Sequence, residues 1–353
     1  MLALCLWVLP PSAYAAELPL DTTELVEELP GEARELIGDL RPDKLPDDSL
    51  PERLWGAFRD QITSHLSGAL HTAGILLLVC VFVALSETLE LGKASPPFII
   101  YAGVAAIGAS AISDLDSYLQ MGMESLRELS EYSRVLLPVL STASAAAGGV
   151  SAAAGKYAAT AMMMDALLSA ANAVVAPGIC AFAALSLANA ALGSELLAMA
   201  KKLVKTVCTS VLSALCMGFT AWLTLTGVLS GVSDTLTARM AKTAISGALP
   251  VVGGILADAA GSLSAAAAVM RNSIGIFGLL AVAGICLESV CSLAVRYMMY
   301  RISAAVCTCV ANKRLGELIR DLGTCFGLIL SLNGAGAMML FVSVYSLMRT
   351  VVG

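Results

Sequence analysis

The sequence is poor in charged, aromatic and histidine residues. Of its 353 residues, 14% are charged and 5% are aromatic, and only 2 are histidine, whereas soluble domains carry roughly 25% charged residues. No run of lysine and arginine of the kind that binds nucleic acid is present. Hydrophobic residues make up 58% of the chain. This composition excludes an ordinary soluble domain and predicts an all-α polytopic membrane protein.

Sequence signatures of catalysis are missing as well. The chain has no GxxxxGK[ST], HExxH or GxSxG motif, which mark nucleotide-binding loops, zinc proteases and serine hydrolases. The closest cysteine pair, Cys307-Thr308-Cys309, has no histidine beside it. His65 and His71 are six residues apart and therefore lie on different faces of a helix. We expect no enzyme, no cofactor and no metal site, and we interpret the cysteines as small buried apolar residues.

The first 69 residues divide into two parts. Residues 1–15 resemble a secretory signal peptide that ends in Ala13-Tyr14-Ala15, although no lysine or arginine precedes its apolar core. Residues 16–69 hold thirteen of the 27 acidic residues and are expected to be exported. The membrane domain is expected over 70–353. An amphipathic helix that continues into the first span is predicted by apolar residues at every fourth position, namely Leu54, Phe58, Ile62 and Leu66.

Eight apolar stretches follow, and three of them are weak. They are 70–86, 96–113, 135–155, 157–175, 177–194, 206–231, 273–292 and 322–348. The weak ones, between 135 and 194, are rich in alanine, and Pro177-Gly178 is expected to separate two of them. With an exported N-terminus, the cytoplasmic loops of an eight-span chain carry ten lysines and arginines and the exterior six, in agreement with the positive-inside rule. Removing two neighbouring weak spans preserves this bias, so we predict six to eight transmembrane helices, with an even number favoured.

Two further segments, 115–136 and 250–271, are amphipathic. Each has apolar side chains on one helical face and polar or charged side chains on the other. Both are expected on the exported side. Such segments lie in the membrane interface, pack against neighbouring helices or line a vestibule, and interfacial packing is the favoured interpretation.

Two acidic residues fall within apolar stretches. Asp165 follows three methionines, and an ionisable group at mid-span costs about 3 kcal/mol or more. Asp165 is therefore either a pore-lining or ion-coupling carboxylate, or a residue near the lipid headgroups because 157–175 is not a true span. Glu288 either faces the bundle interior or lies near the cytoplasmic end beside Arg296, and we favour the second interpretation.

Two GxxxG patterns occur in apolar helices. Glycines four residues apart allow helix backbones to approach closely, so we interpret both patterns as helix contacts within or between subunits. The glycines concerned are Gly227 and Gly231, and Gly323 and Gly327.

Three stretches in the C-terminal half carry a resemblance to a known family. They are Gly-Ala-Leu-Pro-Val-Val-Gly-Gly at 247–254, Arg-Asn-Ser-Ile-Gly at 271–275 and Lys-Arg-Leu at 313–315. With the leader, the acidic segment and the Ala/Gly-rich spans, the whole chain resembles the stage III sporulation protein AE family. The leader without a basic residue departs from the family pattern. The family-like positions have no known catalytic meaning and include Pro250, Gly253, Asp258, Asn272 and Gly275.

The resemblance implies a role in endospore formation. Members of this family lie in the mother-cell membrane around the forespore, within the SpoIIIA–SpoIIQ complex. This channel or secretion-like apparatus connects the two cells and supports forespore integrity and late forespore gene expression. The implied partners are other SpoIIIA proteins, including a separate ATPase and ring-forming exported domains, with SpoIIQ reached indirectly. The chain is also expected to contact the lipid bilayer and further copies of itself, and it is not expected to bind nucleic acid.

An autonomous secondary transporter or permease is the alternative function. Transporters of this kind contain inverted repeats and broken helices around a site at the membrane midplane. Pro177-Gly178 near Asp165 is the one feature that points to such a site, and the halves of the chain show no convincing repeat.

Overall fold

The computed structural model describes residues 25, 29, 33–34, 50–88, 96–147, 150–248, 253–310 and 313–349. Within these ranges, the side chains of 226–266 and of a few residues at helix ends are left aside. The expected signal peptide, most of the acidic segment and Pro250 lie outside the described residues. Every long element in the described ranges is a helix.

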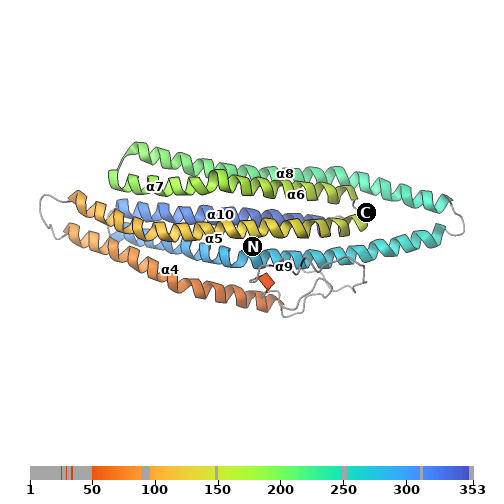
Figure 1. The fold of residues 1–353 in the computed structure, drawn as a ribbon, viewed down its shortest axis with the longest axis horizontal. Helices are drawn as coiled ribbons and strands as arrows, with labels where there is room; N and C mark the ends of the chain where they lie inside the picture. Colours follow the sequence, from red (N-terminus) through yellow and green to blue (C-terminus); the bar gives the residue numbers. More distant parts are fainter. Residues whose placement is uncertain are drawn as a thin grey trace.

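The described helices run back and forth along one long axis (Figure 1). They are α4 (Leu50–Thr88), α5 (Pro96–Ala146), α6 (Val150–Ala170), the π-helical turn η1 (Ala171–Val175), α7 (Ala176–Leu192), α8 (Glu195–Ala248), α9 (Gly253–Val310) and α10 (Lys313–Met348). Because α6, η1 and α7 form one continuous run, the described chain has 6 helical segments long and apolar enough to cross a membrane. The predicted all-α polytopic membrane protein is confirmed, at the lower end of the predicted span number.

The difference from eight apolar stretches lies between residues 96 and 194. Helix α5 contains the stretch 96–113, the amphipathic segment and the beginning of 135–155 in one helix of 51 residues. Pro177-Gly178 does not separate two spans, because Pro177 occupies the first turn of α7, directly after η1. A proline is tolerated there, since the wider π-helical turn already interrupts the regular backbone hydrogen bonds.

The amphipathic segment of α5 packs its apolar face onto the bundle. Its buried side chains include Leu119, Leu126, Leu129 and Leu136, and α5 packs mainly on α9, α10 and α6. Its apolar face thus packs against neighbouring helices, which is one of the three arrangements expected for this segment. The second amphipathic segment belongs to α9 from residue 253 onward, and its side chains are described only from 267.

Several helices are much longer than a bilayer is thick. Helix α8 has 54 residues and α9 has 58, so at 1.5 Å per residue each extends roughly 80–90 Å. The hydrocarbon core of a bilayer is about 30 Å thick. These helices therefore project beyond one bilayer, and Figure 1 shows the end of α8 and the start of α9 extending past the other helices.

Helices α9 and α10 form the centre of the bundle. The most apolar windows of both are 61% buried, compared with 22% for α8. Helix α4 begins at the predicted amphipathic stretch and continues without a break to Thr88, which confirms the continuity expected from the fourfold spacing. The ends of α4, α7 and α9 and the starts of α5, α8 and α10 gather at one end of the molecule (Figure 1). We call this the basic end, because the described residues near it include Lys201, Lys202, Lys205, Lys313, Arg314 and Arg320.

Candidate functional site

A charged network joins α4, α5 and α9 inside the bundle. Arg296 Nη1 lies 2.9 Å from Asp114 Oδ2 and 2.5 Å from Thr72 Oγ1, and Arg296 Nε donates to Tyr118 Oη at 2.8 Å. The guanidinium group also lies over the Tyr118 ring, 4.9 Å from its centroid. Three helices are thus fixed to one another through one arginine side chain.

The Arg296–Asp114 ion pair is largely buried between helices, as is one other ion pair of the described residues, Lys201–Asp321 near the basic end. The Arg296 side chain is 12% exposed and that of Asp114 is 25% exposed. Ionisable groups among membrane helices are costly unless they are paired, and they commonly mark functional positions. The hydrogen bonds that Arg296 donates to the Thr72 and Tyr118 hydroxyl groups add the further partners that a buried ion pair requires.

Glu288 does not pair with Arg296. Its Oε1 lies 3.9 Å from His65 Nε2 of α4, and Arg296 pairs with Asp114 instead. Glu288 and Arg296 are eight residues apart on α9, a separation of about 12 Å along a helix axis, which is too far for contact. Glu288 therefore lies at the α4–α9 contact with its side chain 31% exposed.

The same α4–α9 contact contains a disulfide bond between Cys80 and Cys307. These two residues are separated by 227 positions in the sequence. Both residues are buried, as predicted, but the bond between them was not predicted from the sequence. The prediction of small buried apolar cysteines also holds for Cys208, Cys286, Cys291 and Cys325, and it is wrong for Cys180 and Cys309, which are exposed.

Asp165 lies on the outside of the described chain. Its carboxylate accepts a hydrogen bond from Arg134 of α5 at 3.0 Å, and the Asp165 side chain is 62% exposed. On the same helix as Arg134, Arg127 also pairs with Glu131 at 3.0 Å, and both of these side chains are exposed. Asp165 thus joins an exposed polar face of α5 rather than the interior of the monomer.

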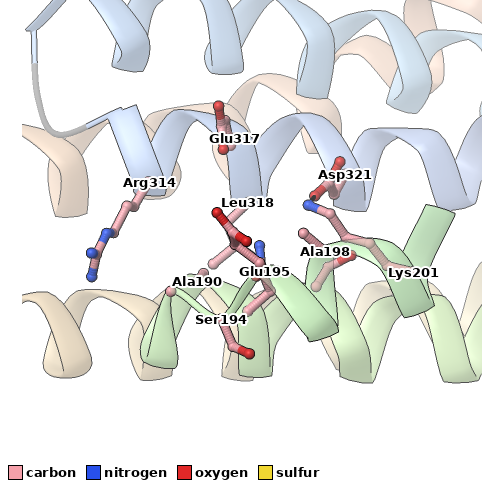
Figure 2. A pocket seen from close by; sticks show the side chains of 12 residues that line it. Ala190, Ser194, Glu195, Ala198, Lys201, Arg314, Glu317, Leu318 and Asp321 are labelled. Carbon is pink, nitrogen blue, oxygen red and sulfur yellow. Dashed lines mark hydrogen bonds and ion pairs between the residues drawn. The ribbon is translucent and has the colours of Figure 1, made fainter.

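A polar cavity of about 220 Å³ lies at the basic end, between α7, α8 and α10 (Figure 2). Lys201 reaches from α8 to Asp321 of α10, with Nζ 2.5 Å from Oδ2. Both of these side chains are less than one-fifth exposed. The remaining charged lining residues are Glu195, Arg314 and Glu317.

Gly193 shapes the wall of this cavity. It has a positive φ of 66° and its N–H donates to Asn189 O at 2.8 Å, which ends α7. A Cβ atom at Gly193 would lie 3.0 Å from Arg314 Nη2. The turn therefore brings the start of α8 against α10, and the Lys201–Asp321 pair closes the contact.

The glycines Gly323 and Gly327 face α9. A Cβ atom would lie 3.0 Å from Tyr300 Cβ at the first position and 3.0 Å from Tyr297 Cε2 at the second. Gly316 continues this row, because a Cβ atom there would lie 3.0 Å from the backbone nitrogen of Thr308. The row lets α9 and α10 approach closely within one subunit. Gly227 and Gly231 lie in the part of α8 whose side-chain contacts are outside the described residues.

Four of the five family-like positions lie on α9. Gly275 is buried on α9 against Met348, and Asn272 is half-buried one turn earlier. Gly253 and Asp258 lie in the first turns of α9, among the residues whose side chains are left aside. Together these positions follow α9 from its start into the bundle.

Two buried cations were not singled out from the sequence. Lys156 and Arg271 are 6% and 7% exposed, and Lys156 Nζ donates to the Ser346 carbonyl near the C-terminal end of α10 at 2.7 Å. Cations are favoured at that end of a helix. Lys156 lies between the apolar stretches 135–155 and 157–175, a position that predicts a loop, whereas the structure places it inside α6, far from the basic end.

The described residues contain no group of three or more His, Cys, Asp or Glu side chains that could hold a metal ion. The charged contacts described above join helices to one another. They define a helical membrane protein whose subunit is held together by small-residue packing and by charge pairs between helices.

The chain belongs to the stage III sporulation protein AE family, whose model matches residues 43–350. The family expected from the C-terminal motifs is confirmed. The protein is therefore a stage III sporulation protein with several membrane-spanning helices. No curated protein and no solved structure matches the chain.

Proposed function

We propose that the chain is a membrane subunit of the channel or secretion-like SpoIIIA–SpoIIQ complex, which connects mother cell and forespore during endospore formation. Membership of the sporulation family over residues 43–350 carries this proposal. In this role the protein supports forespore integrity and late forespore gene expression. The helical bundle supplies a membrane component, while the absence of a nucleotide-binding loop in the sequence assigns ATP hydrolysis to a separate partner.

The orientation of the bundle follows from its charges. The basic end, with Lys201, Lys202 and Lys205, faces the mother-cell cytoplasm under the positive-inside rule. The start of α4 then lies on the opposite side, where the acidic N-terminal segment is exported toward the forespore. This arrangement presents the acidic segment to ring-forming exported domains and, indirectly, to SpoIIQ, and presents the basic end to the cytoplasmic ATPase.

An autonomous transporter receives less support. The described helices between 150 and 192 are continuous, and the irregularity near Asp165 is the π-helical turn η1 rather than a break. A broken helix is what opens backbone groups to a substrate at the midplane in transporters. We therefore retain the complex subunit as the proposed function.

Deletion of the gene in its native spore-forming host tests the proposal. We expect loss of heat-resistant spores and of late forespore reporter expression, and restoration of both by the full chain. The tagged chain, purified from sporulating cells, is expected to bring the other SpoIIIA proteins with it. Normal spore yield in the deletion strain would contradict the proposal.

We propose that the Asp165 carboxylate takes part in this function by contacting the ions or water that pass through the complex. Asp165→Asn is expected to lower spore yield while the protein still accumulates in the membrane. Met162→Leu is a matched control, because Met162 is 64% exposed on the same helix. Equal spore yields from the two variants would remove Asp165 from the functional residues.

A further inference from the structure

One face of α8 exposes large apolar side chains from its first turn onward. At about 3.6 residues per turn, these side chains fall within an arc of about 80° around the helix. They are between 46% and 76% exposed. The residues are Leu196, Met199, Leu203, Val207, Met217 and Leu225. We call these six residues the α8 apolar stripe. On the same face, Ser210 and Ala214 are small and exposed.

The length of the α8 apolar stripe matches a bilayer. From Leu196 to Leu225 it covers about 44 Å of helix, and a bilayer with its headgroups is about 40–45 Å thick. Trp222, which is 45% exposed, lies near one end of the stripe, and tryptophan is enriched where a membrane meets water. Helix α8 lies along one side of the bundle (Figure 1), and its most apolar window is only 22% buried. These features favour lipid as the surroundings of the stripe.

Two lysines border the stripe toward its other end. Lys202 and Lys205 are exposed, whereas Lys201 on the inner side of α8 pairs with Asp321. Around the helix, Lys202 lies about 60° from the edge of the stripe, and Lys205 lies about 60° further on the same side. Residues three apart are neighbours on a helix surface, so both ammonium groups can contact one anionic group.

The charges around these two lysines leave them available to an anion. Among the described residues, no carboxylate forms an ion pair with Lys202 or Lys205. Glu195, in the first turn of α8, lies seven positions before Lys202, which is about 10 Å along the axis. The positive end of the helix dipole of α8 lies at the same end and also favours an anion.

The depth of the lysines suits a lipid headgroup. Lys202 and Lys205 lie about 9 Å and about 14 Å along the axis from Leu196, where the stripe begins. Lysine side chains extend their aliphatic part along apolar surface and keep the ammonium group in the polar layer. The two ammonium groups can therefore reach the headgroup layer while the stripe continues into the hydrocarbon.

Together the lysines and the stripe select an amphiphile with a negative charge. A free phosphate ion would contact the lysines and leave the stripe uncovered. A neutral phospholipid would cover the stripe but would bring no net charge to the lysines. An anionic phospholipid satisfies both parts of the surface, and basic positions beside membrane helices are typical sites for its headgroup.

We propose that Lys202 and Lys205 bind the phosphate of an anionic phospholipid whose acyl chains lie on the α8 apolar stripe. This inference is independent of the proposed function, because it concerns the contact of one helix with the membrane. The bound headgroup lies beside Lys201, which pairs with Asp321. Lipid composition thereby acts next to the contact that holds α8 against α10.

Native mass spectrometry of the purified full chain tests the inference. The protein in detergent is titrated with phosphatidylglycerol or with phosphatidylcholine that has the same acyl chains. We expect phosphatidylglycerol to bind about tenfold more tightly or more, since each lysine near a headgroup contributes favourably to anionic lipid binding. The double variant Lys202→Gln, Lys205→Gln is expected to lose this preference and to bind both lipids alike.

The matched control removes the same charge elsewhere at the basic end. Lys313 and Arg320 are exposed on α10, so Lys313→Gln, Arg320→Gln is expected to retain the preference for phosphatidylglycerol. Leu203→Gln places a polar group on the stripe and is expected to weaken the binding of both lipids. Glycerol phosphate, which has the charge without acyl chains, is expected not to displace bound phosphatidylglycerol.

Several results would overturn the inference. One is equal binding of the two lipids to the unmodified chain, and another is an equal loss of preference in the α10 control, which would indicate attraction to net charge alone. Displacement by glycerol phosphate would show a phosphate site that does not use the stripe. Dimers that bind no lipid and dissociate in Leu203→Gln would place a second copy on the stripe. Thermal unfolding of each variant confirms that the compared proteins are folded.

Discussion

Arg296 of α9 and Asp114 of α5 form an ion pair at 2.9 Å although 182 positions separate them in the sequence. Thr72 of α4 completes the contact with the same guanidinium nitrogen at 2.5 Å. One side chain thus fixes the relative positions of three helices. Because the pair is largely shielded from water, its loss has a larger effect than the loss of a surface pair.

The first prediction concerns this pair. Asp114→Asn leaves the Arg296 guanidinium without its counter-charge among apolar helices, so we expect a loss of stability of about 3–5 kcal/mol. The double variant Asp114→Asn, Arg296→Gln removes both charges and is expected to recover part of that loss. Thermal unfolding of the purified protein in nanodiscs measures both effects.

Arg320→Gln is the control for this experiment. Arg320 lies 3.9 Å from Glu317 in an exposed pair one turn apart on α10, and such pairs contribute about 0–1 kcal/mol. Equal destabilisation by Asp114→Asn and Arg320→Gln would contradict a structural role for the Arg296–Asp114 pair.

The sequence predicts the helical class well, because hydropathy and helical periodicity are local properties. The fourfold spacing from Leu54 to Leu66 indicates that α4 is continuous. The same properties do not reveal where a helix passes through an irregular turn. Proline at 177 therefore suggested a boundary, although η1 allows the helix to continue.

The charged contacts between helices are not predictable in the same way. Asp114 and Arg296 lie at the margins of separate apolar stretches, and only the packing of α5 against α9 brings them together. Cys80 and Cys307 are likewise brought together by the packing of α4 on α9. Asp165 was recognisable as an unusual residue from its neighbours, but its partner Arg134 depends on how α6 folds back along α5.

A second prediction concerns the row of glycines on α10. Gly316→Ala places a methyl group 3.0 Å from the backbone nitrogen of Thr308, so α9 and α10 must move apart. Overpacking of this kind costs about 1–3 kcal/mol. The expected result is a lower thermal midpoint and less protein in the membrane.

Gly334→Ala is the matched substitution on the same helix. Nothing lies within 4 Å of a Cβ atom at Gly334, and alanine favours a helix over glycine by roughly 0.5–1 kcal/mol. We therefore expect an unchanged or higher thermal midpoint. Shifts of the same sign and size in both variants would show that the close approach of α9 and α10 does not determine stability.

A third prediction follows from the Cys80–Cys307 bond. When the protein is alkylated in denaturant without reductant and then digested, the peptides of these two residues are expected to appear linked. Cys309 is exposed and free, so it is expected to be alkylated in the same sample. Complete alkylation of Cys80 without prior reduction would contradict the disulfide bond in the folded protein.

The last prediction concerns the Lys201–Asp321 pair beside the cavity at the basic end. Lys201→Asp places two carboxylates together between α8 and α10, in a contact where both native side chains are less than one-fifth exposed. Repulsion between like charges is expected to separate the start of α8 from α10 and to lower the thermal midpoint. Exchange of the two charges in Lys201→Asp, Asp321→Lys restores the attraction and is expected to recover part of the midpoint. Lys202→Asp provides the control, because Lys202 is adjacent but exposed. If the double exchange is no more stable than Lys201→Asp alone, the pair does not hold α8 against α10.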